Sequence, residues 1–297
     1  MAYYIAESGY LNLLQDTLKY GEHRPSRNGD VISRFGCIVN FENIQERFPL
    51  LTTKRIFFRG VVEELLWFLR GSTDATELQA KDVHIWDGNS TREYLDSIGL
   101  TEYKEGELGP VYGWQWRHFG AQYPEPLSGQ PKDQLKYLIE ELLKEDNSRR
   151  AVLSAWNPVD LPKMALPPCH ILYIFYKNSK GLSCHMTMRS SDLFLGLPFN
   201  IASTALLTFI IAKVLHIPAS KITLSLADAH IYEEHIDAVN TQTSRELYEA
   251  PSLEIQKDAP SLESSIDEKI EWIESLTFND FKLNNYMYNA PIKAPMK

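Results

Sequence analysis

The feature that most limits how this chain can fold is its longest apolar stretch, which covers residues 201–215. An α-helix rises about 1.5 Å per residue, so this stretch is too short to cross a bilayer. Its apolar run is also interrupted by four polar residues, Ser203, Thr204, Thr208 and Lys213. We therefore expect a helix buried in a hydrophobic core and no membrane partner.

The chain is long and apolar enough to build such a core. It has 297 residues, of which 44% are apolar. Length alone suggests one large domain or two small ones. No repeat, low-complexity tract or Pro/Gly/Ser-rich linker divides the sequence. We therefore expect a single domain over residues 1–297.

Charge and cysteine content limit the partners and the compartment. The net charge is −9, which argues against nucleic acid as a substrate, although a local cluster of arginines could still hold a small anion. Three widely spaced cysteines without a C-x-x-C motif favour neither a disulfide framework nor a structural metal site. The first residues lack a basic flank and an apolar signal core. The expected location is the cytoplasm, and a nuclear pool is left open.

The pattern of predicted elements indicates an α+β protein. Leucines and isoleucines recur at helical spacing over residues 11–18 and 135–142, and Ser265 with Glu268 forms a capping box before a third helix. Strand-like runs cover residues 151–156, 171–176, 182–188 and 222–226, with a hairpin connection at 177–181. Helices and strands do not alternate, and no Gly-rich loop follows a strand, so a dinucleotide-binding fold is disfavoured.

Glu64 is the first candidate for chemistry. In a helix over residues 58–70, Arg59, Glu63 and Arg70 fall on one polar strip, whereas Glu64 falls among apolar residues. Such surroundings raise the pKa of a carboxyl group toward the range useful for proton transfer. The alternative is a structural glutamate with a buried partner, or a more exposed helix.

Cys169 is the second candidate. Pro167 and Pro168 precede it and stiffen the backbone on entry to a strand. A thiol becomes a good nucleophile when nearby positive charge lowers its pKa, and His170 is the one candidate cation beside it. The alternative is a small buried apolar residue, which is the interpretation we favour for Cys37 and Cys184.

The third candidate is a polar segment, residues 188–200, that follows a predicted strand. Arg189 and Ser190 can bind phosphate oxygens, and Asn200 has the donor and acceptor needed to recognise an amide-like heterocycle edge. Taken alone, Arg189 and Asp192 slightly favour the alternative of an ordinary ion pair.

With these residues in view, the chain resembles thymidylate synthase. The matching stretches run in family order from about residue 7 to the C-terminus: residues 48–55, 63–68, 85–87, 108–117, 148–150, 154–157, 164–170, 189–192, 195–203 and 228–232. The resemblance implies a single α+β domain with a mixed β-sheet flanked by helices. It also implies reductive methylation of dUMP to dTMP, with methylenetetrahydrofolate as the donor of both carbon and hydride, and no metal.

The resemblance also implies residue roles. Cys169 would add to carbon six of the uracil ring, Glu64 would move protons, Tyr112 would help remove the proton from carbon five, and Arg189 would lie near thiolate and phosphate. The nucleotide-side residues would be Arg27, Arg149, Arg150, His170, Ser190, Asn200, His230 and Tyr232. The folate-side residues would be Lys54, Trp86, Asn89, Asp192, Leu195 and Gly196. Because Arg149 and Arg150 reach into the neighbouring subunit in this family, a homodimer is implied.

Several positions depart from the usual family pattern. Met188 replaces a glutamine, Thr204 a tyrosine and Ala227 a glycine. The phosphate loop is one residue shorter and carries Asp30, and the C-terminus lacks the usual His-Pro pair and apolar last residue. These changes leave two alternatives open. One is a paralogue that hydroxymethylates or methylates a related pyrimidine nucleotide, and the other is a non-catalytic homologue that binds nucleotide.

Overall fold

The computed structural model describes residues 2–145 and 148–296. Contacts between Cα atoms divide the chain into two compact units, each made of separate segments. Unit 1 comprises Met1–Phe57, Phe175–Gln256 and Phe281–Lys297, and unit 2 comprises Phe58–Ile174 and Lys257–Asp280. The predicted class, a mixed sheet with helices, is confirmed. The expectation of a single domain stays a prediction.

Unit 1 contains most of the sheet. Its elements are β1 (Ala2–Ile5), α1 (Ala6–Tyr20), β2 (Glu22–Arg24), β3 (Val31–Glu42), β6 (Gly181–Asp192), α7 (Gly196–Val214), β7 (Ala219–Tyr232), the 3-10 helix η3 (Glu233–His235), α8 (Ile236–Thr243), β8 (Ser252–Ile255) and β9 (Phe281–Asn284). The strands run in the order β1-β3-β7-β6, with β2 beside β3. The pairs β1–β3 and β6–β7 are parallel and β3–β7 is antiparallel, so the sheet is mixed.

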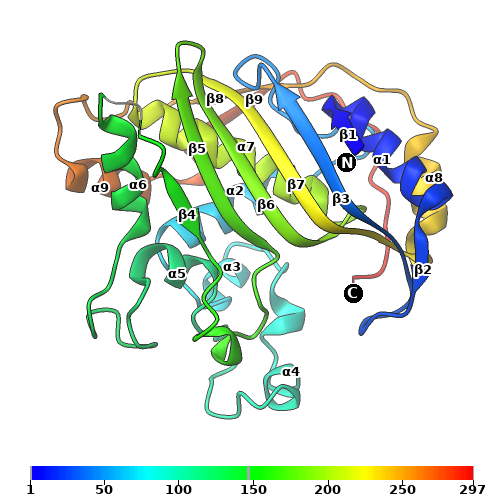
Figure 1. Ribbon diagram of the computed structural model, residues 1–297, viewed down its shortest axis with the longest axis horizontal. Coiled ribbons are helices and arrows are strands. Elements are labelled where there is room, and N and C mark those ends of the chain that lie inside the picture. The colour runs from blue at the N-terminus through cyan, green and yellow to red at the C-terminus, as the bar shows by residue number, and fades with distance from the viewer. Residues whose placement is uncertain (1, 146–147, 297) are drawn as a thin grey trace. The chain divides into compact units, whose positions relative to one another are not determined.

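Helix α7 is the predicted core helix. Figure 1 shows it behind β6 and β7, and 78% of its most apolar window is buried. Leu197, Ile201 and Ile210 are fully buried. Because the helix is apolar on all sides, it needs neighbours on all sides, and the sheet and the surrounding loops supply them. It is the only helix in the described part of the chain with the length and composition of a membrane span.

The strands of unit 1 alternate between two faces. Met186 and Met188 of β6 and Leu224 and Leu226 of β7 are buried against the helices. Residues between them on the same strands are half-buried or exposed on the opposite face. Since successive side chains of a strand point to opposite faces, this register fixes which residues of β6 reach the open side.

Unit 2 is mainly helical. Its elements are α2 (Phe58–Leu69), α3 (Thr76–Gln79), η1 (Asp87–Asn89), α4 (Arg92–Ser97), α5 (Tyr112–His118), α6 (Gln134–Leu143), β4 (Val152–Ser154), η2 (Leu161–Lys163), α9 (Ile266–Glu274) and η4 (Phe278–Asp280). Strand β5 (His170–Asn178) begins in unit 2, where it pairs antiparallel with β4, and ends in unit 1. The capping box at Ser265 and Glu268 begins α9 as predicted.

The predicted hairpin between β5 and β6 is also confirmed. Gly181 begins β6 with a φ of +118°, which L side chains rarely adopt. A Cβ atom at this position would collide with the carbonyl oxygen of Pro218. Glycine is therefore required here for both conformation and space.

Candidate active site

Cys169 lies immediately before β5 with its side chain partly exposed. Its backbone N–H donates to the hydroxyl of Tyr112, with an N–O distance of 2.7 Å. Pro167 and Pro168 restrict the approach to it. The thiol is thus held on a fixed backbone beside a phenol, as a nucleophile requires. Cys37 and Cys184 are 1% and 2% exposed, as predicted for core residues.

Aromatic rings enclose the Tyr112 side of Cys169. The Tyr112 ring stacks on His170 with a centroid distance of 4.1 Å, and Phe68 and Trp86 pack against it at 4.8 and 6.1 Å. Burial raises the pKa of Tyr112 well above its usual value. The phenol therefore stays protonated at neutral pH and can donate a hydrogen bond to, or accept one from, a reacting group.

His170 is not the cation that the sequence suggested. It is buried, and burial lowers its pKa to about 3. Its Nδ1 forms a 2.8 Å hydrogen bond with the hydroxyl of Tyr173. His170 is therefore neutral at physiological pH. The interpretation of this residue as the positive charge that activates Cys169 is wrong.

Glu64 lies on α2 with its carboxyl group enclosed, although part of the side chain remains accessible. Its Oε1 accepts a 2.8 Å hydrogen bond from the indole Nε1 of Trp86. Burial raises its pKa to about 7, against the opposing effect of that hydrogen bond. The predicted pKa increase is confirmed. The buried partner is a neutral donor rather than a cation, so the carboxyl group can still gain or lose a proton near neutral pH.

The predicted polar strip on α2 is only partly correct. Arg59 is exposed, but Glu63 is only 5% exposed. The carboxylate of Glu63 forms a 2.7 Å ion pair with Lys81. A cation from outside the helix makes burial of this charge tolerable, and sequence spacing on one helix cannot reveal such a partner.

Three further candidates of unit 2 lie on turns and loops. Asn89 is half-buried at the end of η1, and its backbone N–H donates to the carbonyl oxygen of Trp86 at 3.1 Å. It is thus hydrogen-bonded to the backbone of Trp86, whose indole contacts Glu64. Arg149 and Arg150 are exposed.

In unit 1, the nucleotide-side candidates lie at the ends of two paired strands. Ser190 of β6 is opposite Asp228 of β7, and Asp192 is opposite His230. The sequence placed Arg189, Ser190 and Asp192 after a strand, whereas β6 continues through all three. Arg189 is half-buried on the face opposite to the buried Met188. The Met188 thioether therefore belongs to the core.

His230 and Tyr232 lie at the end of β7. His230 is 9% exposed, its Nδ1 is 3.2 Å from Asp228 Oδ1, and its ring meets that of Tyr232 at 5.3 Å. Asp228 in turn lies 3.4 Å from a guanidinium nitrogen of Arg24. The sequence did not identify Asp228 or Arg24 as partners, because Arg24 of β2 reaches Asp228 of β7 only across β3.

The folate-side candidates shape the turn into α7. Oδ1 of Asp192 accepts backbone hydrogen bonds from Phe194 at 2.9 Å and Leu195 at 3.2 Å. Gly196 begins the helix, and Asn200 lies half-buried in its first turns. The carbonyl oxygen of Asn200 accepts from the hydroxyl of Thr204, at 2.7 Å. Thr204 is 1% exposed, so this departure lies in the core.

Lys54 lies beneath the same turn. It is 5% exposed, donates to the carbonyl oxygen of Phe194, and its ammonium lies 3.5 Å from the centroid of the Phe194 ring. Burial lowers its pKa to about 7, partly offset by Asp192. Lys54 thus holds the turn that contains the other folate-side residues. Its place on the folate side stays a prediction.

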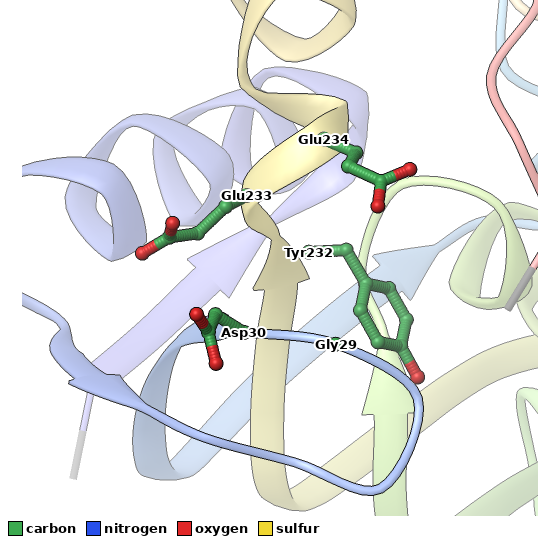
Figure 2. Close-up of a pocket in the computed structure, with 5 residues that line it drawn as sticks. All are labelled: Gly29, Asp30, Tyr232, Glu233 and Glu234. Carbon is green, nitrogen blue, oxygen red and sulfur yellow. The ribbon is translucent and has the colours of Figure 1, made fainter.

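Arg27 lies on an exposed turn beside an acidic pocket. Its Nε donates to the side chain of Asn28 at 3.2 Å. Gly29, Asp30, Tyr232, Glu233 and Glu234 line a cavity of about 140 Å³ (Figure 2). The carboxylates disfavour an anion in this cavity, so the cavity itself is a poor site for a phosphate. No group of three or more metal-ligating side chains occurs among the described residues.

Comparison with known proteins agrees with this arrangement. The family model for thymidylate synthase matches residues 8–297. The chain belongs to the thymidylate synthase family. The match includes the residues that the sequence suggests for reaction and recognition: Glu64, Tyr112, Cys169, Arg189 and Asn200.

Individual relatives of this thymidylate synthase family member cover nearly the whole chain. A thymidylate synthase of Herpesvirus ateles is 45% identical over 295 residues, which are 98% of both chains. A putative bifunctional dihydrofolate reductase-thymidylate synthase of rice is 48% identical over 98% of this chain and 57% of its own length. A bifunctional soybean relative is 50% identical over 93% and 51%. The chain thus spans about half the length of these plant relatives.

Proposed function

We propose that this chain catalyses the reductive methylation of dUMP to dTMP with methylenetetrahydrofolate as co-substrate. The observation that carries the proposal is the cluster in unit 2. It combines a partly exposed Cys169, a protonated Tyr112 hydroxyl 2.7 Å from the Cys169 backbone nitrogen, and a Glu64 carboxyl with a pKa of about 7. These are a nucleophile, a proton donor or acceptor, and a group that titrates at working pH.

The proposed chemistry uses these groups in sequence. The Cys169 thiolate adds to carbon six of uracil, and the electron pair of the ring double bond makes carbon five nucleophilic. Carbon five attacks the one-carbon unit of the folate. Its own proton then leaves with help from Tyr112, and the bond between the one-carbon unit and the folate nitrogen breaks, which leaves a methylene group on carbon five. A hydride from the tetrahydrofolate ring reduces the bound one-carbon unit to a methyl group. Elimination of Cys169 restores the double bond and releases dTMP and dihydrofolate.

Glu64 would move protons to and from the pyrimidine oxygen through water during these steps. A carboxyl group serves this role best when its pKa lies near the working pH. Burial places Glu64 there. Its hydrogen bond with the Trp86 indole fixes one oxygen and leaves the other for exchange.

Unit 1 would supply recognition. Arg27, Arg189 and Ser190 would bind the phosphate, His230 and Tyr232 the ribose hydroxyl, and Asn200 the uracil edge. Asp192, Leu195, Gly196 and Lys54 would face the folate, with Trp86 and Asn89 of unit 2. The Asp192 hydrogen bonds to Phe194 and Leu195 support this proposal because they fix the turn before a ligand arrives.

We also propose a homodimer. In the strands of unit 1, Phe35 of β3 is 88% exposed and Tyr176 of β5 is 61% exposed. Large exposed aromatic side chains on a sheet are typical of an interface. Arg149 and Arg150 are exposed, as required of residues that would bind nucleotide in the partner subunit.

Product identification tests the proposal. The protein is mixed with dUMP and methylenetetrahydrofolate, dihydrofolate is followed by absorbance, and the nucleotide product is identified by mass. Equal amounts of dTMP and dihydrofolate are expected. A hydroxymethyl nucleotide with tetrahydrofolate would replace the proposal with the paralogue alternative, and nucleotide binding without product would indicate the non-catalytic one.

A further inference from the structure

The C-terminal strap, residues 285–296, is hydrogen-bonded to other segments of unit 1 at several points. Asn289 donates its backbone N–H to the carbonyl oxygen of Thr52 at 2.7 Å. Arg245 bridges the carbonyl oxygens of Thr53 and Ala290 at 2.8 and 2.5 Å. These bonds hold the middle of the strap but not its end.

The end of the strap is held by His235. This side chain is fully buried, and its Nε2 lies 2.8 Å from the carbonyl oxygen of Pro295. A carbonyl oxygen can only accept, so Nε2 must carry the hydrogen. The bond therefore fixes the tautomer of His235, leaving Nδ1 as the nitrogen that faces away from the strap.

The other side of His235 faces the candidate ligand-binding residues of unit 1. Its Nδ1 is buried, makes no hydrogen bond within the described residues, and lies 3.9 Å from Oδ1 of Asp192. Its ring packs against Phe194 and Tyr232, each with a centroid distance of 5.5 Å. One buried side chain thus touches the strap, the folate-side turn and a nucleotide-side tyrosine.

We propose that His235 is a positioning residue that latches the end of the C-terminal strap to the turn formed by Asp192 and Phe194. Without the Nε2–Pro295 bond, the end of the strap is released and the His235 ring is no longer held in one orientation against Phe194. The catalytic consequence rests on the proposed function. Since the turn is on the folate side, loss of the His235–Pro295 hydrogen bond raises the KM for methylenetetrahydrofolate more than the KM for dUMP.

Two matched substitutions separate the effect of the hydrogen bond to Pro295 from the effect of packing around the His235 ring. The amide nitrogen of His235→Gln reaches the position of Nε2 and can still donate to Pro295, whereas that of His235→Asn corresponds to Nδ1 and cannot. Both variants lose the ring contacts with Phe194 and Tyr232. Any difference between them therefore reports the hydrogen bond to the strap.

The rate of hydrogen exchange of the strap amides, measured by mass spectrometry without substrates, directly reports whether the end of the strap is held. We expect exchange about 5- to 10-fold faster in His235→Asn, the range for one buried hydrogen bond, and within about 2-fold of the unsubstituted protein in His235→Gln. Equal exchange in the two variants would overturn the latch. Because no turnover is involved, this result does not depend on the proposed reaction.

Truncation after Ala294 provides a test that leaves the buried histidine intact. It removes the Pro295 acceptor, so we expect it to raise the folate KM about 5- to 10-fold, with kcat and the dUMP KM changed less than 2-fold. In this background His235→Asn and His235→Gln should no longer differ from each other, because the acceptor of the distinguishing hydrogen bond is gone. A difference that persists between them, or a parallel rise in both KM values, would mean that His235 acts only through core packing.

Discussion

At the scale of single residues, burial controls the protonation of the groups around Cys169. It keeps His170 neutral, keeps Tyr112 protonated and brings Glu64 to a pKa of about 7. These effects share one cause, desolvation of the charged form. His170 therefore does not supply the positive charge that would activate the thiol, and Arg189 stays its predicted source.

Glu64 makes stability depend on pH in a defined direction. Its pKa is about 7 in the folded protein and 4.5 when unperturbed, so the folded state binds more protons between these values. Stability should fall as pH rises through this window. We expect Glu64→Gln to match the original protein near pH 4.5 and to exceed its unfolding free energy at pH 8 by about 1–3 kcal/mol, measured by urea denaturation.

Glu63→Gln is the matched control for this prediction. It loses the 2.7 Å ion pair with Lys81, so at pH 8 it should be less stable than the original protein. If Glu64→Gln raised the free energy of unfolding equally at both pH values, burial of a charge would not be the cause of the stabilisation.

Asp30 should weaken dUMP binding. It lines the acidic pocket beside the turn that carries Arg27 (Figure 2). Removing its charge with Asp30→Asn should lower the KM for dUMP about 2- to 3-fold at low salt, and the effect should fade at high salt because exposed charges are screened. The exposed Glu254 on β8 provides a control, since Glu254→Gln should leave this KM unchanged. A salt-independent effect of Asp30→Asn would contradict the electrostatic explanation.

At the scale of elements, the sequence predicted helices better than strands. Helices can be recognised within a few residues of sequence, from the apolar spacing around Leu14 and Leu138 and from the capping box at Ser265. Strands β6 and β7 extend beyond their predicted ends, through polar Asp192 and Tyr232. The end of β6 pairs with β7 at Asp192 and His230, and the end of β7 pairs with β3 at Tyr232 and Val31. Local composition does not encode such pairing across a long sequence separation.

The capping box of α9 gives a prediction at this scale. The Ser265 hydroxyl accepts from Glu268 N–H, while the Glu268 carboxylate accepts from Ser265 N–H. Ser265→Ala should lower the free energy of unfolding by about 1 kcal/mol in urea titrations. Ser264→Ala, one residue outside the cap, should change it by less than half as much. Equal losses would mean that the cap does not stabilise the helix.

At the scale of the whole molecule, both units are assembled from distant segments. Arg117 of unit 2 forms ion pairs with Asp133 and with Glu274, 157 residues away. In unit 1, β9 pairs with β8, and His235 meets the strap 60 residues later. His235 therefore escaped the sequence analysis, since only its neighbours in space give it a role. The family motifs located the other candidates because they mark reacting groups directly.

The proposed dimer is testable through the exposed Phe35. We expect a sedimenting mass twice that of the 34.1 kDa chain. Phe35→Asp should shift the equilibrium toward monomer and reduce activity, because a charge at the centre of an interface is costly to bury. Leu127, which is 89% exposed in unit 2, is the matched control, and Leu127→Asp should leave the mass unchanged. A monomeric original protein with full activity would contradict the dimer.

The most direct test of the account is the rate of dTMP formation by Cys169→Ser. A serine hydroxyl is far less nucleophilic than a thiolate, so we expect turnover to fall at least about 10³-fold with unchanged sedimentation and urea denaturation. Cys37→Ala, at a buried strand position, should retain turnover when folded. Turnover by Cys169→Ser at a rate within about 10-fold of the original protein would show that another group forms the covalent bond.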